Sequence, residues 1–122
     1  MDRQTIMLGI YGLLLGDAMG VPYEFHAAVE IPEWDDIDFE PPVGFRRSYE
    51  DVLPGTWSDD GAQALCLLDS LLRCGELDID DLANCLLDWA DSGLWAVDGR
   101  VFDCGIQTMS SLRTFASGTS PL

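Results

Sequence analysis

A helix is predicted over residues 4–19, where apolar side chains run almost without interruption. Four glycines recur every three or four residues and therefore lie near one face of this helix: Gly9, Gly12, Gly16 and Gly20. Each interior glycine costs roughly 1 kcal/mol relative to alanine, so close packing of this face is expected to offset the cost. We therefore expect a buried helix. The apolar run from Ile6 to Leu15 is too short and too interrupted by glycine to span a bilayer, and it lacks a signal-peptide cleavage pattern.

The pattern changes between residues 21 and 57, where no long helical periodicity is present. Five prolines break any long helix in this stretch: Pro22, Pro32, Pro41, Pro42 and Pro54. Loops of more than roughly 15 residues inside compact domains are usually functional or mobile. Two interpretations remain open, a flap over a binding site and a solvated loop with a turn or two of helix.

Helical periodicity resumes after Ser58, the expected N-cap of a helix that ends at Cys74 and Gly75. One face of this helix carries four leucines, which is typical of a core-facing side: Leu65, Leu68, Leu71 and Leu72. Another helix is expected between Asp78, as its cap, and Gly93. Its apolar residues recur at i, i+3, i+4 and i+7: Leu82, Cys85, Leu86 and Trp89.

A further helix is expected from about residue 104 to residue 116, with Asp103 at its start and Gly118 just beyond its end. The chain shows no strand-like alternation of useful length and no internal repeat. The pattern therefore predicts an all-α fold.

The net charge of the chain limits the kinds of molecule that it is expected to bind. The chain of 122 residues contains 22 acidic residues against six basic ones, all of them arginine, for a formal net charge of −16. Such a field repels phosphate backbones and anionic lipid, so we expect neither nucleic acid nor a membrane surface as a partner. Most of this charge is expected to be a solvated surface. A metal cation is the partner that an acidic site would still attract.

The cysteines indicate a reducing compartment. Cys66, Cys74, Cys85 and Cys104 form no C-x-x-C pair, which argues against a zinc site or a thioredoxin-like motif. Nothing in their spacing suggests a disulfide framework, so a cytoplasmic location is expected.

The sharpest candidate site is the Ser-Asp-Asp triplet (Ser58, Asp59 and Asp60), which places one hydroxyl and two carboxylates where a loop enters a helix. Mg²⁺ and Mn²⁺ prefer oxygen ligands of this kind. Side chains of consecutive helical residues diverge by roughly 100°, so they can converge on one ion only through the non-helical geometry of a cap. Ordinary helix capping explains the same residue types.

Two other groups could carry chemistry. Glu24 follows a proline and lies between two aromatic residues, so its carboxyl group could move a proton or contact a sugar hydroxyl, although a surface carboxylate is equally ordinary. Asp103 and Gly105 stand at a helix start, where backbone N–H groups can approach a ligand closely. The adjacent Arg46 and Arg47 could meet a diphosphate, but an ion pair within the acidic loop is expected instead.

Together, the order and spacing of these groups resemble the ADP-ribosylglycohydrolase family. The resemblance rests on three runs: Gly-Leu-Leu-Leu-Gly-Asp-Ala-x-Gly-x-Pro-x-Glu-Phe from Gly12, Pro-Gly-x-x-Ser-Asp-Asp from Pro54, and Asp-x-Gly-Ile-Gln-Thr from Asp103. It covers nearly the whole chain. It implies an all-α orthogonal bundle of which residues 1–122 form the N-terminal portion of a single domain.

The resemblance also implies roles for the candidate residues. The Ser-Asp-Asp triplet matches the first ligand cluster for a pair of Mg²⁺ or Mn²⁺ ions, with Gly61 where the family usually has threonine. Glu24 matches the glutamate beside the substrate ribose, and Asp103 and Gly105 match residues that line the ADP-ribose pocket. Glu24, Asp59 and Asp60 are therefore expected to be catalytic. The implied reaction is hydrolysis of the bond between ADP-ribose and an acceptor, on a protein or a small molecule.

One part of the family pattern is absent. The second ligand cluster, a Gly-Asp-Thr-Asp-Thr-like run in the C-terminal half of longer members, has no match here. We therefore expect an incomplete bundle that is inactive by itself. The alternative is a non-catalytic protein on the same scaffold, either crystallin-like or an interaction protein. An exposed core surface could also let the chain associate with itself.

Overall fold

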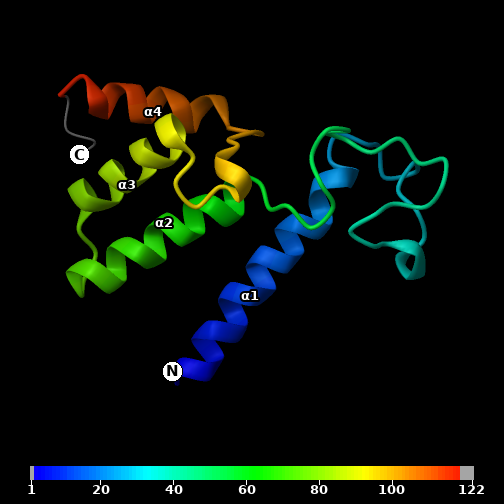
Figure 1. Cartoon of the computed structure of the whole chain (residues 1–122), viewed down its shortest axis with the longest axis horizontal. Coiled ribbons are helices and arrows are strands. Elements are labelled where there is room, and N and C mark those ends of the chain that lie inside the picture. The colour runs from blue at the N-terminus through cyan, green and yellow to red at the C-terminus, as the bar shows by residue number, and fades with distance from the viewer. Residues whose placement is uncertain (1, 119–122) are drawn as a thin grey trace. The chain divides into compact units, whose positions relative to one another are not determined.

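The structure, a computed structural model, describes residues 2–118 and consists of helices joined by loops (Figure 1). The α-helices are α1 (Arg3–Gly20), α2 (Asp59–Cys74), α3 (Ile79–Ser92) and α4 (Ile106–Ala116). Three single turns of 3-10 helix accompany them: η1 (Val21–Tyr23), η2 (Trp34–Asp36) and η3 (Val97–Gly99). No strand is present among residues 2–118, which confirms the all-α prediction.

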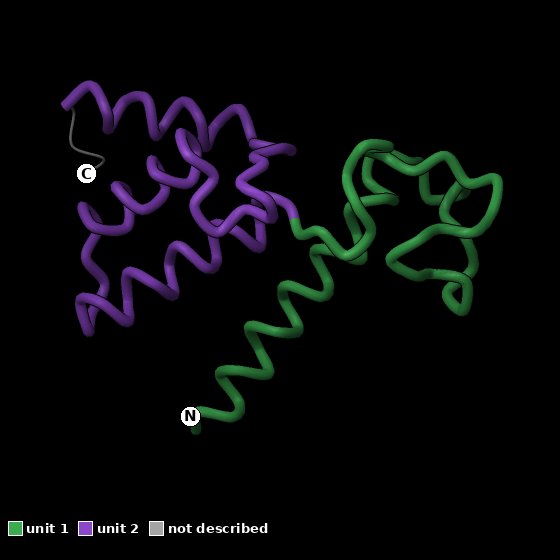
Figure 2. Tube along the Cα trace, viewed as in Figure 1, with its two compact units in different colours: residues 1–57 green, residues 58–122 purple. Residues whose placement is uncertain are grey.

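The chain forms two compact units, residues 1–57 and residues 58–122 (Figure 2). The first unit contains α1, η1, η2 and the long loop. The second contains α2, η3, α3 and α4. That both units belong to one domain stays a prediction.

Helix α1 begins and ends within one residue of its predicted bounds, but it is not buried. Ala18 is its only buried residue, whereas Leu8 is 62% exposed and Leu15 is 56% exposed. The expected close packing of the glycine face is not formed by the described residues. A Cβ added at Gly9, Gly12, Gly16 or Gly20 would meet no atom within 4 Å.

The apolar segment is also longer than the run on which the sequence argument relied. Residues 3–23 have a mean hydropathy of 1.4 and are long and apolar enough to cross a membrane, with 17% of the apolar window buried. The prediction that this segment is too short was therefore wrong. Core helices of soluble proteins and signal sequences meet the same length and composition criteria.

The loop of the first unit is ordered around η1. Tyr23 is buried, and its hydroxyl donates to the backbone oxygen of Asp38 at 2.9 Å and accepts from the Asp38 N–H at 3.1 Å. The Tyr23 ring also packs on Phe45, with ring centroids 5.2 Å apart. The turns expected in a solvated loop are present as η1 and η2. Buried Tyr23 therefore ties residues far along the loop back to the end of α1.

In the second unit, α2 packs on α3 through small side chains. Ala62, Cys66 and Ser70 are buried at intervals of four residues, and α3 contributes buried Cys85 and Trp89. Small residues allow the two backbones to approach closely, which explains why the leucines are not the buried face of α2. The sequence predicted that all four leucines face the core. This prediction was wrong for the last two, because Leu71 is 38% exposed and Leu72 is 75% exposed.

The start of α3 and the C-terminal ends of α2 and α3 follow the predicted capping chemistry. The Asp78 carboxylate accepts from the Asp81 N–H at 3.0 Å. Gly75 and Gly93 close their helices in the left-handed region, with φ of 76° and 74°. The α4 start was predicted wrongly. Gly105 is its N-cap, and Asp103 lies outside the helix.

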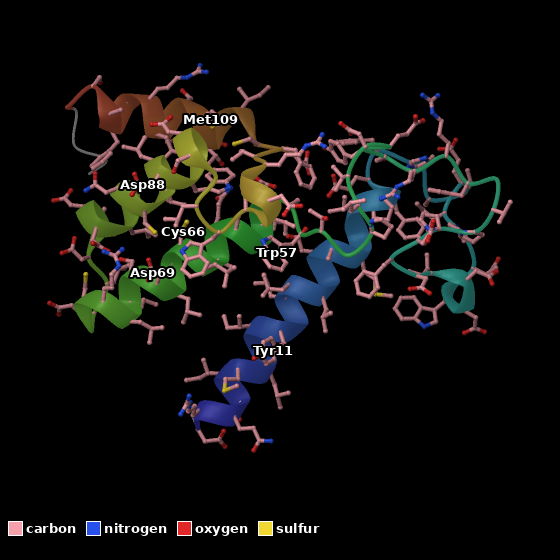
Figure 3. All side chains as sticks on the ribbon, viewed as in Figure 1. Tyr11, Trp57, Cys66, Asp69, Asp88 and Met109 are labelled. Atoms are coloured by element: carbon pink, nitrogen blue, oxygen red, sulfur yellow. The ribbon has the colours of Figure 1, made fainter. Side chains whose placement is uncertain are left out.

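Burial of Cys66 makes the stability of the second unit dependent on alkaline pH. Burial, with smaller contributions from nearby Cys85, Asp69 and Asp88, raises the pKa of the Cys66 thiol from its ordinary value of 9.0 to about 12. Figure 3 shows Cys66 and Asp69 on α2 and Asp88 on α3. Between pH 9 and 12 the folded state therefore holds a proton that the unfolded state has lost. The contribution of this thiol to the free energy of unfolding is therefore fully present below pH 9 and is lost as the pH rises from 9 to 12.

We expect the free energy of unfolding to fall by up to roughly 1.4 kcal/mol per pH unit above pH 9 because of this thiol. Urea unfolding followed by circular dichroism at pH 8.5, 9.5 and 10.5 measures the slope. The slope should decrease in Cys66→Ala and persist in Cys74→Ala, which removes an exposed thiol. Equal slopes in the parent and Cys66→Ala would contradict this assignment.

Candidate functional site

The Ser-Asp-Asp triplet lies at the N-terminal end of α2, as predicted. Ser58 is 5% exposed, Asp59 is half-buried and Asp60 is exposed. Ser58 is the N-cap by position, yet its side chain makes no capping hydrogen bond. Its hydroxyl instead lies 3.4 Å from Asp59 Oδ1, a long distance for a hydroxyl–carboxylate hydrogen bond. Capping therefore does not account for the hydroxyl of this serine.

The Asp59 carboxylate is held in place from its own helix. Gln63, one turn along α2, donates from Nε2 to Asp59 Oδ2 at 3.0 Å. The other carboxylate oxygen faces the Ser58 hydroxyl. The Asp59 carboxylate thus lies between Gln63 of its own helix and Ser58 at the N-cap position.

The second candidate group precedes α4. Asp103 is half-buried and adopts a left-handed backbone with φ of 54°, a conformation that aspartate tolerates better than most residues. Gly105 is exposed and has no side chain to cap the first turn of α4. The N-terminal N–H groups of α4 therefore have no side-chain cap at the N-cap position, and such groups favour an anionic ligand.

These two junctions lie close together in the second unit. Burial raises the pKa of the Cys104 thiol, and the negative charges of Asp59 and Asp103 raise it further. Figure 1 likewise shows the starts of α2 and α4 at the same end of this unit. Residues from positions 59 and 103 thus gather at one place, and their negative charge attracts a cation.

Glu24 lies in the first unit, directly after η1. Its carboxylate oxygen Oε2 is buried, and its backbone oxygen accepts from the Ser48 hydroxyl. The same backbone oxygen lies 2.9 Å from His26 Nδ1. The backbone at Glu24 is therefore fixed by two neighbours. The structure brings the triplet and Asp103 into one unit, and it places Glu24 in the other.

The donor set fits a hard divalent cation in part. The triplet offers one hydroxyl and two carboxylates, the oxygen ligands that Mg²⁺ and Mn²⁺ favour. Within residues 2–118, no group of three or more His, Cys, Asp or Glu side chains is arranged to hold a metal ion. The triplet therefore supplies fewer ligands than the usual six-coordinate shell of either ion requires.

The sequence did not predict a second cluster of polar and aromatic residues, which lies in the first unit. The adjacent arginines were expected to form an ion pair within the acidic loop, and Arg46 does pair with Glu50 at 3.2 Å. In the structure, His26, Arg46 and Arg47 line one pocket together with Phe25 and Tyr49. The only signal in the sequence was the Arg-Arg pair in a chain with six basic residues.

Comparison with known proteins places these features in a family. Two curated relatives are named ADP-ribosylarginine hydrolase Tri1. The protein from Serratia proteamaculans (strain 568) is 34% identical over 106 residues, which is 87% of this chain and 27% of that protein. The protein from Pseudomonas putida (strain GB-1) is 35% identical over 103 residues, which is 84% of this chain and 26% of that protein.

A third relative, the uncharacterized protein YegU of Escherichia coli (strain K12), is 35% identical over 94 residues, which is 74% of this chain and 28% of that protein. The chain thus spans about a quarter of the length of the curated relatives it matches. No solved structure matches it. The sequence profile of the ADP-ribosylglycohydrolase family matches residues 2–122. The chain therefore belongs to the ADP-ribosylglycohydrolase family, as its motifs predicted.

Proposed function

We propose that the starts of α2 and α4 form part of the active site of a hydrolase that removes ADP-ribose from arginine side chains. The observation that carries this proposal is that the start of α2, with Asp59, and the segment before α4, with Cys104, lie at the same end of the second unit. Family membership supports the reaction class. The names of the Serratia and Pseudomonas relatives support arginine as the acceptor.

In this proposal the Ser-Asp-Asp triplet holds Mg²⁺ or Mn²⁺, one or both ions of a pair. When bound, such an ion orients ribose hydroxyls and lowers the pKa of a bound water. Asp103 accepts hydrogen bonds from the sugar, and Gly105 lets the ligand approach the backbone N–H groups of α4. The family signature supports these assignments, because each residue matches a motif position.

Glu24 is proposed to move the proton. Hydrolysis forms a bond between a water oxygen and the anomeric carbon and breaks the bond from that carbon to the guanidino nitrogen. The water loses a proton to the Glu24 carboxylate, and the Glu24 carboxyl group then passes that proton to the departing nitrogen. The match of Glu24 to its position in the family motif supports this role.

The chain by itself is proposed to be inactive, because its triplet offers only part of a metal coordination shell. A non-catalytic protein on the same scaffold is the competing proposal. The observation that favours it is Gly61, which stands where threonine is usual and leaves no side chain to support the triplet. Mn²⁺ binding tests the metal assignment, and a chimera described in the Discussion tests catalysis.

Asp59→Asn combined with Asp60→Asn is expected to weaken Mn²⁺ binding at least tenfold, because the amides keep the shape of the carboxylates and lose their charge. The free Mn²⁺ signal in electron paramagnetic resonance measures binding to the chain. Asp35→Asn with Asp36→Asn is a matched control. These two exposed acids also lie in the first turn of a helical segment, η2, and their removal changes the net charge equally.

The control should bind Mn²⁺ as the parent does. Equal weakening in both double variants would assign Mn²⁺ to the general negative field of the chain. Unchanged binding in the Asp59 and Asp60 variant would remove the metal role of the triplet.

A further inference from the structure

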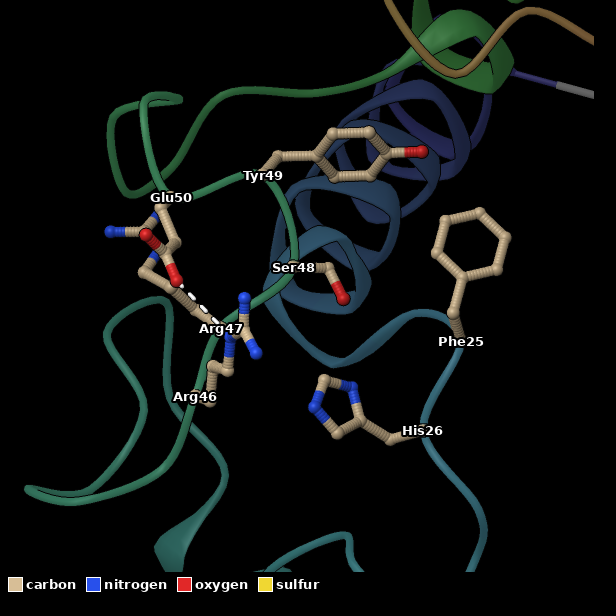
Figure 4. Close-up of a pocket in the computed structure, with 7 residues that line it drawn as sticks. All are labelled: Phe25, His26, Arg46, Arg47, Ser48, Tyr49 and Glu50. Carbon is tan, nitrogen blue, oxygen red and sulfur yellow. Dashed lines mark hydrogen bonds and ion pairs between the residues drawn. The ribbon is translucent and has the colours of Figure 1, made fainter.

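The first unit contains a pocket that the hydrolase proposal does not use. Its volume is about 390 Å³, within the roughly 300–1,000 Å³ typical of small-molecule sites. Figure 4 shows Phe25 and His26 on one side of the pocket and Arg47, Ser48 and Tyr49 on the other. Two chain segments therefore form it, one directly after η1 and one about twenty residues further along.

Hydrogen bonds hold these two segments together without any ligand. The Ser48 N–H donates to the Pro22 oxygen at 2.9 Å, and the Ser48 hydroxyl donates to the Glu24 oxygen. His26 packs on Phe45, with ring centroids 4.6 Å apart. The walls of the pocket are thus pre-formed, which lowers the entropic cost of binding.

Two adjacent arginines give this pocket an excess of positive charge. Arg46 pairs with Glu50 at 3.2 Å, but the two side chains are 88% and 69% exposed, and an exposed pair of this kind contributes little. Arg47 is better held, since its Nη2 donates to the Val52 oxygen at 2.6 Å. Its Nε is buried and makes no hydrogen bond within residues 2–118, so the remaining donors that face the pocket belong to the terminal nitrogens. A guanidinium group has five N–H donors, so donors remain for a ligand.

Aromatic rings border the same pocket. The Phe25 ring is 82% exposed, and its centroid lies 6.0 Å from that of Tyr49 in an edge arrangement. Both residues have a left-handed backbone, with φ of 61° and 53°. Bulky residues in this region are strained, and such strain clusters at ligand-binding sites. An exposed ring that lines the same pocket as two guanidinium groups offers a stacking surface for a flat ligand.

We propose that this pocket binds a phosphorylated ligand that carries a flat ring, the chemistry of a nucleotide. The guanidinium groups of Arg46 and Arg47 hold the phosphate, with the phosphate replacing Glu50 as the partner of Arg46. Phe25 and Tyr49 contact the base. A simple carboxylate would use the arginines and leave the rings exposed. The site lies wholly in the first unit and needs no metal, so it stands apart from the assignment of the triplet.

Calorimetry of the chain in EDTA, with AMP, inorganic phosphate and adenosine as probes, tests this site. AMP should bind at least tenfold more tightly than phosphate or adenosine, because only AMP engages both the arginines and the rings. Arg46→Gln with Arg47→Gln should weaken AMP binding at least tenfold. Phe25→Leu should weaken AMP binding severalfold and leave phosphate binding unchanged.

Arg3→Gln with Arg113→Gln removes the same charge from exposed positions elsewhere and should bind AMP as the parent does. Circular dichroism melting establishes that each variant is folded. Equal AMP binding by the parent and the Arg46 and Arg47 variant would overturn the proposal. So would adenosine binding as tightly as AMP, or a Phe25→Leu variant with unchanged affinity for AMP. Because EDTA removes divalent ions, these outcomes are independent of the Mn²⁺ titration.

Discussion

Asp59→Asn combined with Asp60→Asn is expected to lower ADP-ribose release at least 100-fold in a chimera with the Serratia proteamaculans relative. In this chimera, the chain replaces the segment that it matches, about 27% of that protein. A 100-fold loss corresponds to about 2.7 kcal/mol of barrier, within the several kcal/mol that a catalytic metal contributes. Release of ADP-ribose from an ADP-ribosylated arginine peptide with Mn²⁺ measures the effect.

The matched control again uses η2. Asp35→Asn with Asp36→Asn in the chimera should retain activity within twofold of the unmodified chimera, since it removes equal charge from exposed positions outside the proposed site. A folded chimera that releases no ADP-ribose would overturn the hydrolase proposal and support the non-catalytic alternative. Full activity after loss of both Asp59 and Asp60 would remove these two residues from catalysis.

Helix ends in this chain follow from local chemistry, and for that reason the sequence predicts most of them. Asp78 caps α3 with its own side chain, and glycine supplies the left-handed residue after α2 and after α3. These interactions span four residues or fewer. The α4 start fails the same rule, because the Asp103 backbone turns left-handed and Gly105 becomes the N-cap.

Burial depends on partners far along the chain, so periodicity predicts it less well. The leucine stripe of α2 marks an apolar face, yet the buried contact with α3 runs through Ala62, Cys66 and Ser70. Small residues pack there because they let two helices approach, which is a property of the pair and not of either helix. Exposure of α1 has the same origin, since its apolar residues have few partners within the first unit.

The candidate site was likewise predictable from the sequence only in its residue types, and its spatial arrangement was not. Residue types at the start of α2 indicate oxygen ligands, and the family motifs indicate which ones matter. The closeness of Asp59 to Cys104 could not be predicted from spacing, because the residues between them must first fold as α2, α3 and η3. The pocket beside Phe25 was missed because left-handed aromatic residues have no recognisable sequence pattern.

Gly93→Ala is expected to destabilise the second unit by about 3 kcal/mol or more, the largest stability effect of a single substitution that we predict. Gly93 closes α3 with φ of 74° and is buried. A Cβ there would lie 2.1 Å from the backbone oxygen of Gly99 and 2.6 Å from its Cα. Backbone cannot move aside as a flexible side chain can. Overpacking of about 1–3 kcal/mol therefore adds to a left-handed cost of about 1–2 kcal/mol.

Gly75→Ala separates the two contributions. Gly75 closes α2 with nearly the same φ, 76°, but a Cβ there would meet no atom within 4 Å. This variant should cost only the left-handed conformation, about 1–2 kcal/mol. Urea unfolding followed by circular dichroism compares the free energies of unfolding of the two variants. Equal losses would show that the loop at Gly99 moves aside without a measurable free-energy cost. Residues 94–104 connect Gly93 to Gly105, so a displaced loop would also move Asp103. Gly93→Ala in the Serratia chimera should therefore lose activity where Gly75→Ala does not.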